Sequence, residues 1–388
     1  MNKKIRVAVG LSGGVDSSVS AALLKEQGFD VIGVFMKNWD DEAVRTPIMD
    51  GCTSAEDQED ARKVAKILNV PFHIMHFEKE YWDKVFANFI SEYRRGRTPN
   101  PDVLCNKFIK FGYFLKKSVK ELKVDFIATG HYVRKVCAKG ASASGGKSEK
   151  FAPKAHPPRA EKVKSYELLA AVDKNKDQSY FLYALNQKQL SRALFPIGEL
   201  TKPEVRELAK KFRLPTADKK DSQGICFVGE VQLKKFLKQW IKPHKGGIIT
   251  VDGKKIGEHD GAEYFTIGQR HGLNVGGGIP YYVVSKNIKK NIVYVAAGTT
   301  HSALFKEELR VKNINWISGK VPKFPLRVMA RIRYRQPLQS CRIAKSEIRN
   351  PKSEILKVIF NKPQRSVTSG QSAVFYDKET MLGGGIII

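Results

Sequence analysis

Acidic residues, paired cysteines and long apolar runs are all scarce in this chain of 388 residues. No stretch approaches the ~20 consecutive apolar residues of a membrane span, so we expect no membrane partner. The five cysteines are scattered without a C-x-x-C pair or a metal-ligand spacing, which disfavours a disulfide framework and an iron–sulfur cluster. Only Met1 to Lys4 precede the first apolar stretch, which leaves no room for a targeting peptide. These absences predict a cytoplasmic protein.

The deficit of acidic residues leaves a large positive charge. Lysine and arginine number 68 against 39 aspartates and glutamates, and the net charge is +29. A field of this size favours a polyanionic partner and salt-sensitive association, which an enzyme for a small metabolite does not need. We therefore expect nucleic acid as the partner.

A glycine-rich run follows the first apolar stretch and opens a helical pattern. Such a junction collects free backbone N–H groups and the positive end of a helix dipole, which together bind phosphate. No lysine follows the glycines, which excludes a Walker A loop. Serine hydroxyls stand there instead, with the carboxylate of Asp16, which could help hold Mg²⁺. The run comprises Gly10, Leu11, Ser12, Gly13, Gly14, Val15, Asp16, Ser17 and Ser18.

The sequence S-G-G-V-D-S-S within this run resembles the PP-loop of ATP pyrophosphatases, which split ATP between the α- and β-phosphates. The alternative interpretation is a plain strand–turn–helix in a parallel sheet. Apolar runs at 31–36, 72–77 and 126–129 alternate with helical patterns at 54–68 and 79–93. This alternation predicts an α/β fold with a doubly wound parallel sheet and ligands at the carboxyl ends of its strands. Met36 and Gly130-His131 lie at such ends.

The rest of the chain predicts further parts. We expect an ATP-pyrophosphatase (adenylating) domain over 1–214, with a basic surface insertion at 139–164. A capping box at Thr201–Glu204 predicts a helix to about Phe212. Short β-branched runs beyond residue 245 predict a small β-rich central domain over 215–299 and a C-terminal β-barrel over 300–388. A second irregular insert is expected at 344–352.

Two cysteines stand in electropositive surroundings. Cys105 is expected near a helix start at about Leu104, with Lys107 close by, and both features lower a thiol pKa. Asp102, three residues upstream, suits a helix cap or proton transfer. Cys226 follows two lysines in the glycine-containing D-S-Q-G-I-C-F, which indicates an exposed, activated thiol. The alternative for both cysteines is a small buried apolar residue, and nothing local shows that they meet.

Eight motifs over almost the whole chain resemble, in the same order, the bacterial tRNA-specific 2-thiouridylase family. They are S-G-G-V-D-S-S, F-M-K-N-W (35–39), G-R-T-P-N-P-D-V-L-C-N-K (96–107), A-T-G-H-Y (128–132), N-K-D-Q-S-Y-F-L (175–182), D-S-Q-G-I-C-F, R-Y-R-Q (333–336) and G-Q-S-A-V-F-Y (370–376). The departures are the 139–164 insertion and the stretch near residue 350, and neither removes a motif.

The resemblance implies 2-thiolation of the wobble uridine of tRNA, with ATP and Mg²⁺ as cofactors and a cysteine desulfurase or sulfur-carrier protein as donor. It implies that Gly10 to Ser17 bind the ATP phosphates, with Met36 and Gly130 around the adenosine. It implies Cys226 as the persulfide carrier and Cys105 as the partner thiol. The residues at the target uridine would be Asn100, Pro101 and Asp102. The remaining tRNA contacts would be His131, Lys176, Asp177, Gln178, Arg333, Tyr334 and Gln371.

Three competing functions use parts of the same sequence. A synthetase or ligase for a small carboxylate would share the ATP loop but would need neither two activated cysteines nor the charge. A non-catalytic RNA-binding module would not need Ser12, Asp16 and Ser17. A thiolase with an iron–sulfur cluster or a rhodanese-like domain is disfavoured by the cysteine spacing. Within the favoured function, sulfur could leave Cys226 as sulfide or attack directly, and the sequence does not choose.

Overall fold

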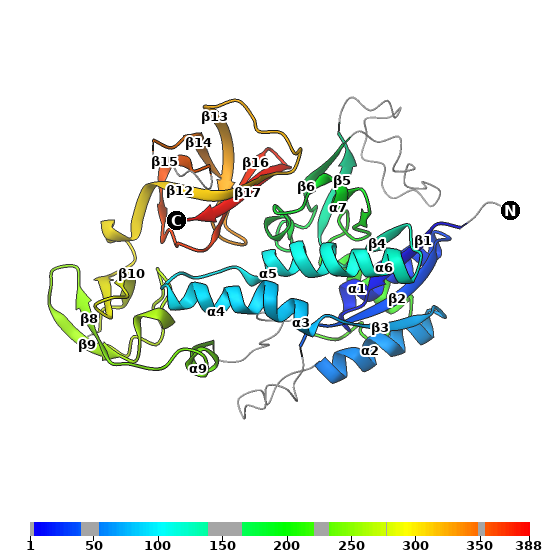
Figure 1. The fold of residues 1–388 in the computed structure, drawn as a ribbon, viewed down its shortest axis with the longest axis horizontal. Helices are drawn as coiled ribbons and strands as arrows, with labels where there is room; N and C mark the ends of the chain where they lie inside the picture. Colours follow the sequence, from blue (N-terminus) through cyan, green and yellow to red (C-terminus); the bar gives the residue numbers. More distant parts are fainter. Residues whose placement is uncertain (1–3, 40–53, 139–164, 221–232, 277, 348–353) are drawn as a thin grey trace.

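The structure is a computed structural model that describes residues 4–39, 54–138, 165–220, 233–276, 278–347 and 354–388 (Figure 1). The expected basic insertion at 139–164 and Cys226 lie outside these ranges. None of the helices within them combines the length and apolarity needed to cross a membrane.

A five-stranded parallel sheet forms the N-terminal part, in the order β3-β2-β1-β4-β7. Every residue of β1 except the first is buried, as expected when helices cover both faces. Successive side chains of β1 point to opposite faces of the sheet. Val7 and Val9 therefore belong to one apolar cluster, and Ala8 belongs to the other. The strands are β1 (Arg6–Gly10), β2 (Asp30–Lys37), β3 (Phe72–His76), β4 (Phe126–Ala128) and β7 (Ala193–Leu194).

Helices cover the two faces of this sheet. The Val7 and Val9 face packs against α1 (Val15–Glu26), α2 (Ser54–Ile67) and α8 (Lys202–Lys211). The Ala8 face packs against a second set, which includes two π-helical segments. That set comprises α3 (Glu78–Tyr81), η1 (Trp82–Phe86), α4 (Ala87–Arg94), α5 (Pro101–Leu104), η2 (Cys105–Phe114) and α6 (Leu115–Glu121). The parallel sheet and helices confirm the predicted α/β fold.

The central part is a four-stranded sheet in the order β10-β11-β8-β9, beside a short helix. Its core includes Ile248, Val283 and Val293, which are fully buried. Its elements are α9 (Leu233–Lys238), β8 (Gly246–Thr250), β9 (Lys255–His259), η5 (Ala262–Tyr264), β10 (Tyr281–Asn287) and β11 (Ile292–Ala297), followed by η6 (Ser302–Leu304). This arrangement confirms the prediction of a small β-rich part.

Six antiparallel strands then close into a barrel, because β12 pairs with both β15 and β17. Its strands are β12 (Phe305–Trp316), β13 (Leu326–Arg331), β14 (Gln339–Lys345), β15 (Leu356–Arg365), β16 (Ser372–Asp377) and β17 (Thr380–Ile387). The irregular insert expected at 344–352 is wrong at its first two residues, and 348–352 lie outside the described residues. Ala344 and Lys345 continue β14 in register with Lys357 and Leu356, because cross-strand pairing extends the strand.

A hairpin from the N-terminal half joins the barrel sheet. It consists of β5 (Val133–Cys137) and β6 (Tyr166–Ala170), and β6 pairs with the start of β17. Glu379, at the turn before β17, forms ion pairs with Arg134 (2.5 Å) and Lys174 (2.7 Å). The remaining short elements, η4 (Ser179–Phe181) and α7 (Gln187–Leu190), follow this hairpin.

Candidate functional site

The glycine-rich run forms a closed turn between β1 and α1. The backbone N–H of Ser12 donates to Oγ of Ser17 at 3.1 Å, and the two hydroxyl oxygens lie 3.2 Å apart. Ser17 Oγ in turn donates to the carbonyl of Gly14 at 3.1 Å. The first N–H groups of α1 have no carbonyl partner within the helix and gather at this turn. The turn therefore offers the donors that an anion requires.

Glycine is required at two places around this turn. Gly13 has φ +74°, and a Cβ there would lie 2.3 Å from the carbonyl oxygen of Asp57. A Cβ on Gly130 would lie 2.7 Å from the backbone nitrogen of Ser17, so the segment after β4 rests directly on the start of α1. At Gly14, by contrast, the nearest atom would be Ser12 Oγ at 3.5 Å, an ordinary contact.

The predicted nucleotide residues come together at one edge of the sheet. Gly10 ends β1, Met36 lies near the end of β2, and Gly130 follows β4. The terminal carbon of Met36 would lie 3.0 Å from a Cβ on Gly10, so the two residues are neighbours. The carboxyl ends of these parallel strands therefore converge where ligands bind in doubly wound folds.

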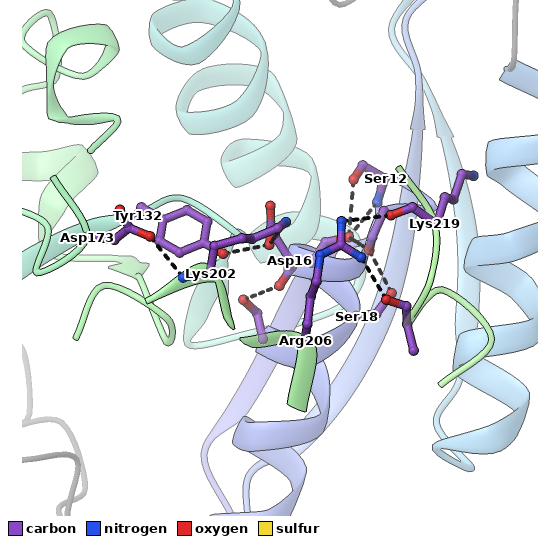
Figure 2. A network of polar contacts seen from close by, with 12 residues as sticks. Ser12, Asp16, Ser18, Tyr132, Asp173, Lys202, Arg206 and Lys219 are labelled. Carbon is purple, nitrogen blue, oxygen red and sulfur yellow. Dashed lines mark hydrogen bonds and ion pairs between the residues drawn. The ribbon is translucent and has the colours of Figure 1, made fainter. Parts of the chain in front are cut away.

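Asp16 is the centre of a polar network (Figure 2). Its Oδ1 accepts a hydrogen bond from the hydroxyl of Tyr132 at 2.8 Å and pairs with Nζ of Lys202 at 2.7 Å. The Lys202 side chain is 10% exposed and that of Asp16 is 32% exposed. The backbone N–H of Lys202 donates to Asp173 Oδ2 at 2.9 Å, which fixes the start of α8. The carboxylate therefore stays accessible while its lysine partner is buried.

A second lysine joins α2 to the segment after α8. Nζ of Lys219 lies 2.7 Å from Asp57 Oδ1 and 2.6 Å from Asp60 Oδ2. Burial alone lowers the pKa of Lys219, but the hydrogen bonds and charges of the two carboxylates outweigh it and raise the pKa. Arg206 donates to the carbonyls of Ala217 and Lys219, at 2.8 and 3.1 Å. These contacts hold the chain as far as Lys219, just before the range 221–232 that the structure does not describe.

The segment that leads to Cys105 is held by both β-rich parts. Thr98 donates from its backbone to Ser369 O at 2.9 Å, and its hydroxyl lies 3.1 Å from that of Thr266. Nε2 of Gln371 donates to the carbonyls of Thr98 and Pro99, at 3.0 and 3.2 Å. The approach to residues 100–105 is thus held by contacts from the central part and from the barrel.

Helix α5 starts at Pro101, with Asn100 as its N-cap, three residues earlier than expected. Proline at the first helical position is compatible with a helix start because its missing N–H needs no partner. Asp102 occupies the first turn without being the cap. Cys105, near the helix start as predicted, is 1% exposed and begins the π-helical η2. π-helical turns are often found at functional sites.

The side chain of Gln189 stabilises the π-helical segment η2. Nε2 of Gln189 donates to the carbonyls of Lys107 and Phe111, at 2.9 and 3.0 Å. Nδ2 of Asn106 donates to the carbonyl of Phe181 at 3.3 Å. The helix that carries Cys105 is therefore tied to the segment around η4.

The segment 176–178 connects to the glycine-rich turn, through Tyr132, and to the barrel. Gln178 exchanges hydrogen bonds with the backbone of Tyr132, at 2.9 and 3.0 Å. Asp177, 1% exposed, accepts from two backbone N–H groups and pairs with Arg331 at 3.1 Å. Lys176 precedes this buried pair.

His131 lies beside the turn and is buried, with Nδ1 2.8 Å from the hydroxyl of Thr129. Burial, and secondarily the charge of Lys110, hold the pKa of His131 well below its ordinary range. The imidazole is therefore neutral.

Two of the other candidate tRNA residues have structural contacts of their own. Nη2 of Arg333 donates to the carbonyls of Ile267 and Ser366, at 2.9 and 3.0 Å, which joins the barrel to the central part. The ring of Tyr334 lies 4.7 Å from that of Phe181, and the guanidinium of Arg335 lies over it at 5.2 Å. The aromatic pair bridges the barrel and the N-terminal part.

The structure thus brings the predicted nucleotide residues together at the sheet edge, joins Thr98 and Pro99 to Gln371, and joins Asn106 to Phe181. It does not place Cys226, which lies outside the described residues. Sequence reasoning assigned no role to Tyr132, Lys202 or Arg331. The sequence held one signal for Lys202. The glycine-rich run contains no lysine, so a cation for this site had to come from another part of the chain.

Three family models match consecutive parts of the chain. The tRNA methyl transferase HUP domain matches 5–230, the tRNA methyl transferase PRC-barrel domain matches 234–297, and the aminomethyltransferase beta-barrel domain matches 306–387.

Full-length relatives carry a different activity in their names. The tRNA-specific 2-thiouridylase MnmA of Geobacillus thermodenitrificans is 46% identical over 391 residues, which covers 100% of this chain and 96% of the relative. The protein of the same name from Streptococcus uberis is 47% identical with the same coverage. Among solved structures, a 4-thiouridine synthetase–RNA complex with bound ATP covers 60% of this chain and 50% of its own, at 13% identity and a TM-score of 0.32. That last likeness is too low to carry an argument.

Proposed function

The chain belongs to the tRNA-specific 2-thiouridylase family, and on that premise we propose that it catalyses the ATP-dependent 2-thiolation of the wobble uridine of tRNA. The observation that carries the proposal is the convergence around the nucleotide turn. A phosphate-binding turn with an accessible Asp16 is linked through Tyr132 to Gln178, and 98–106 is held by contacts from all three parts. A basic chain of net charge +29 suits a tRNA substrate.

The first step is adenylation of the uridine C2 oxygen. This carbonyl is urea-like and has no leaving group, so attack of the oxygen on the α-phosphate turns the oxygen into one and releases pyrophosphate. The N–H groups at the turn between β1 and α1 would stabilise charge on the phosphates in this step. Met36 and Gly130 would border the adenosine.

The residues at the turn fit Mg²⁺ as a companion of ATP. Asp16 offers a partly exposed carboxylate, and no cluster of three or more ligating side chains occurs within the described ranges. Mg²⁺ is usually bound by one or two carboxylates together with substrate phosphates and waters. When bound there, it would offset phosphate charge, and Asp16 would hold it.

Sulfur transfer is the second step. A persulfide on Cys226 carries the sulfur, supplied by a cysteine desulfurase or a sulfur-carrier protein. In one route, the Cys105 thiolate attacks the Cys226 sulfur, a disulfide forms, and released hydrosulfide displaces AMP from C2. In the other, the terminal persulfide sulfur attacks C2 and displaces AMP. Cys105 then attacks the Cys226 sulfur and frees the thiocarbonyl. Both routes end in a Cys105–Cys226 disulfide, which a reductant must reopen.

Substrate contacts complete the proposal. Asn100, Pro101 and Asp102 would face the extruded uridine, which must leave its stack to react. His131, Lys176 to Gln178, Arg333, Tyr334 and Gln371 would contact or position the tRNA. In this proposal the chain divides into domains over 1–214, 215–299 and 300–388. The C-terminal barrel binds tRNA, and the protein acts in the cytoplasm.

A reconstituted assay tests this function. Protein, ATP, Mg²⁺, a persulfide donor and unmodified tRNA are incubated, and 2-thiouridine and AMP are measured. We expect Cys226→Ser and Cys105→Ser to abolish thiolation while tRNA affinity stays near that of the wild type. Cys341→Ser, which changes a buried thiol inside the barrel, is the matched control. Wild-type thiolation by Cys226→Ser would refute the role of that residue.

A further inference from the structure

The glycine-rich turn lacks a lysine, although a triphosphate carries several negative charges. In the described structure a lysine reaches the turn from elsewhere. Nζ of Lys202 lies 2.7 Å from Oδ1 of Asp16, in the first turn of α1, and the two residues are 186 positions apart. The ammonium group is thus at the place where loop N–H groups and a carboxylate already gather (Figure 2).

The start of α8 holds Lys202 in this position. Thr201 caps the helix, and Oε2 of Glu204 accepts from its backbone N–H at 2.7 Å. The backbone N–H of Lys202 is bonded to Asp173 Oδ2, so both the main chain and the capping box fix the origin of the side chain. A long side chain that starts from a fixed backbone and ends at a fixed carboxylate loses little further freedom when a ligand binds.

Burial sets Lys202 apart from the other lysines of α8. Its side chain is 10% exposed, whereas those of Lys210 and Lys211 are 66% and 69% exposed. A buried ammonium group is costly unless it is paired, and breaking such a pair leaves an uncompensated charge. The pairing partner here is the one carboxylate of the glycine-rich run.

We propose that Lys202 is the phosphate-binding cation of this site and contacts the pyrophosphate portion of ATP. The inference rests on the proposed use of ATP. An ammonium group has three donors, so it can contact Asp16 and a phosphate oxygen together. Charge on the bridging oxygen and the departing pyrophosphate grows during adenylation, and a fixed cation stabilises it without reorganisation. Lys202 thus takes the part that the loop lysine takes in Walker A sites.

A purely structural role, in which Lys202 only joins α8 to α1, makes a different prediction. Calorimetric titrations with α,β-methylene-ATP and with AMP, both with Mg²⁺, distinguish the two. The first ligand cannot be cleaved between the α- and β-phosphates, and the second lacks the pyrophosphate. We expect Lys202→Met to weaken α,β-methylene-ATP binding about tenfold or more, and AMP binding by less than about twofold. Lys202→Arg, which keeps the charge, should bind the triphosphate better than Lys202→Met.

Two further variants keep the test decisive. Lys202→Gln can still hydrogen-bond to Asp16 and should fold even if Lys202→Met does not, but it carries no charge and should show the same selective loss. Lys210→Met removes an exposed charge from the same helix and should bind both ligands as the wild type does. Equal loss of both ligands, or no loss, in Lys202→Gln overturns the inference. If wild-type protein binds neither ligand, the proposed ATP use itself fails, which is a separate result.

Discussion

Gln371 and Thr98, 273 residues apart, are joined by a hydrogen bond of 3.0 Å from the side-chain Nε2 to the main-chain carbonyl. The same nitrogen lies 3.2 Å from the carbonyl of Pro99. Gly370, with φ +94°, brings the barrel so close that a Cβ there would lie 2.8 Å from Thr98 O. The barrel therefore sets the path of the chain just before α5.

Gln371→Ala removes the side-chain nitrogen that makes both of these hydrogen bonds. An unsatisfied, partly buried carbonyl costs about 1–3 kcal/mol, so we expect the free energy of unfolding to fall by that amount. Because the loss loosens 98–102, thiolation should fall while α,β-methylene-ATP affinity stays unchanged. Denaturant unfolding and the thiolation assay measure the two effects. Gln339→Ala, which removes an exposed hydrogen bond from the Gln339 side chain to the carbonyl of Pro337 in the barrel, is the control and should change neither.

The buried pair of Arg331 and Asp177 predicts a larger effect on stability. Arg331→Met leaves the Asp177 carboxylate buried without its cation and should lower the free energy of unfolding by about 3–5 kcal/mol. The double variant Arg331→Met/Asp177→Asn removes the stranded charge and keeps the Oδ1 acceptor, so it should recover part of that loss. Lys255→Met, which breaks an exposed pair with Glu258, should leave the free energy of unfolding close to that of the wild type, because solvent screens exposed pairs. A double variant less stable than Arg331→Met would contradict this account.

Adjacent glycines of the turn should respond differently to alanine. Gly13→Ala forces a side chain into φ +74° and against Asp57, so we expect a lower melting temperature. Gly14→Ala meets only an ordinary contact and should melt as the wild type does. If phosphate occupies the space beside Gly14, the same variant should still bind α,β-methylene-ATP less well than the wild type. Unchanged affinity in Gly14→Ala would place the phosphates elsewhere.

His131 predicts a pH dependence of stability. Because the pKa of His131 is lowered, its imidazole stays unprotonated in the folded protein. In the unfolded chain the same imidazole takes up a proton below about pH 6.5, the ordinary histidine pKa. Protons then favour the unfolded state, so stability should fall as pH drops below that value. The fall in melting temperature should be shallower in His131→Gln, in which His259, whose pKa is also lowered, still contributes. Identical slopes in the two proteins would refute the assignment.

The parts of the fold that local patterns encode were predictable. Alternating apolar runs and helical patterns predicted the parallel sheet, and the capping box predicted the start of α8, because neighbours within a few residues determine both. The start of α5 was predicted three residues late, since two prolines also suit an extended approach. The edge pairing of β6 with β17 joins residues more than 200 positions apart, and no local signal encodes it.

The candidate site shows the same difference between residues with local partners, which could be predicted, and residues with distant partners, which could not. The turn from Gly10 to Ser17 could be recognised because all its chemistry lies within one short run. Lys202 was missed because its partner lies at the other end of the N-terminal part, and a capping box accounts for its local sequence. The structural contacts of Arg333 were equally hidden, since its acceptors come from the central part and from beyond β15.

The hairpin of β5 and β6 limits how the chain can be cut for experiments. Leu168 and Leu169 extend the barrel sheet by pairing with Met381 and Thr380, and Glu379 pairs with two cations from the N-terminal half. A fragment that ends before the barrel would leave the β6 edge open, and open edges promote association between chains. Chimaeras that exchange the barrel with a relative should therefore carry residues 133–137 and 165–174 along with it.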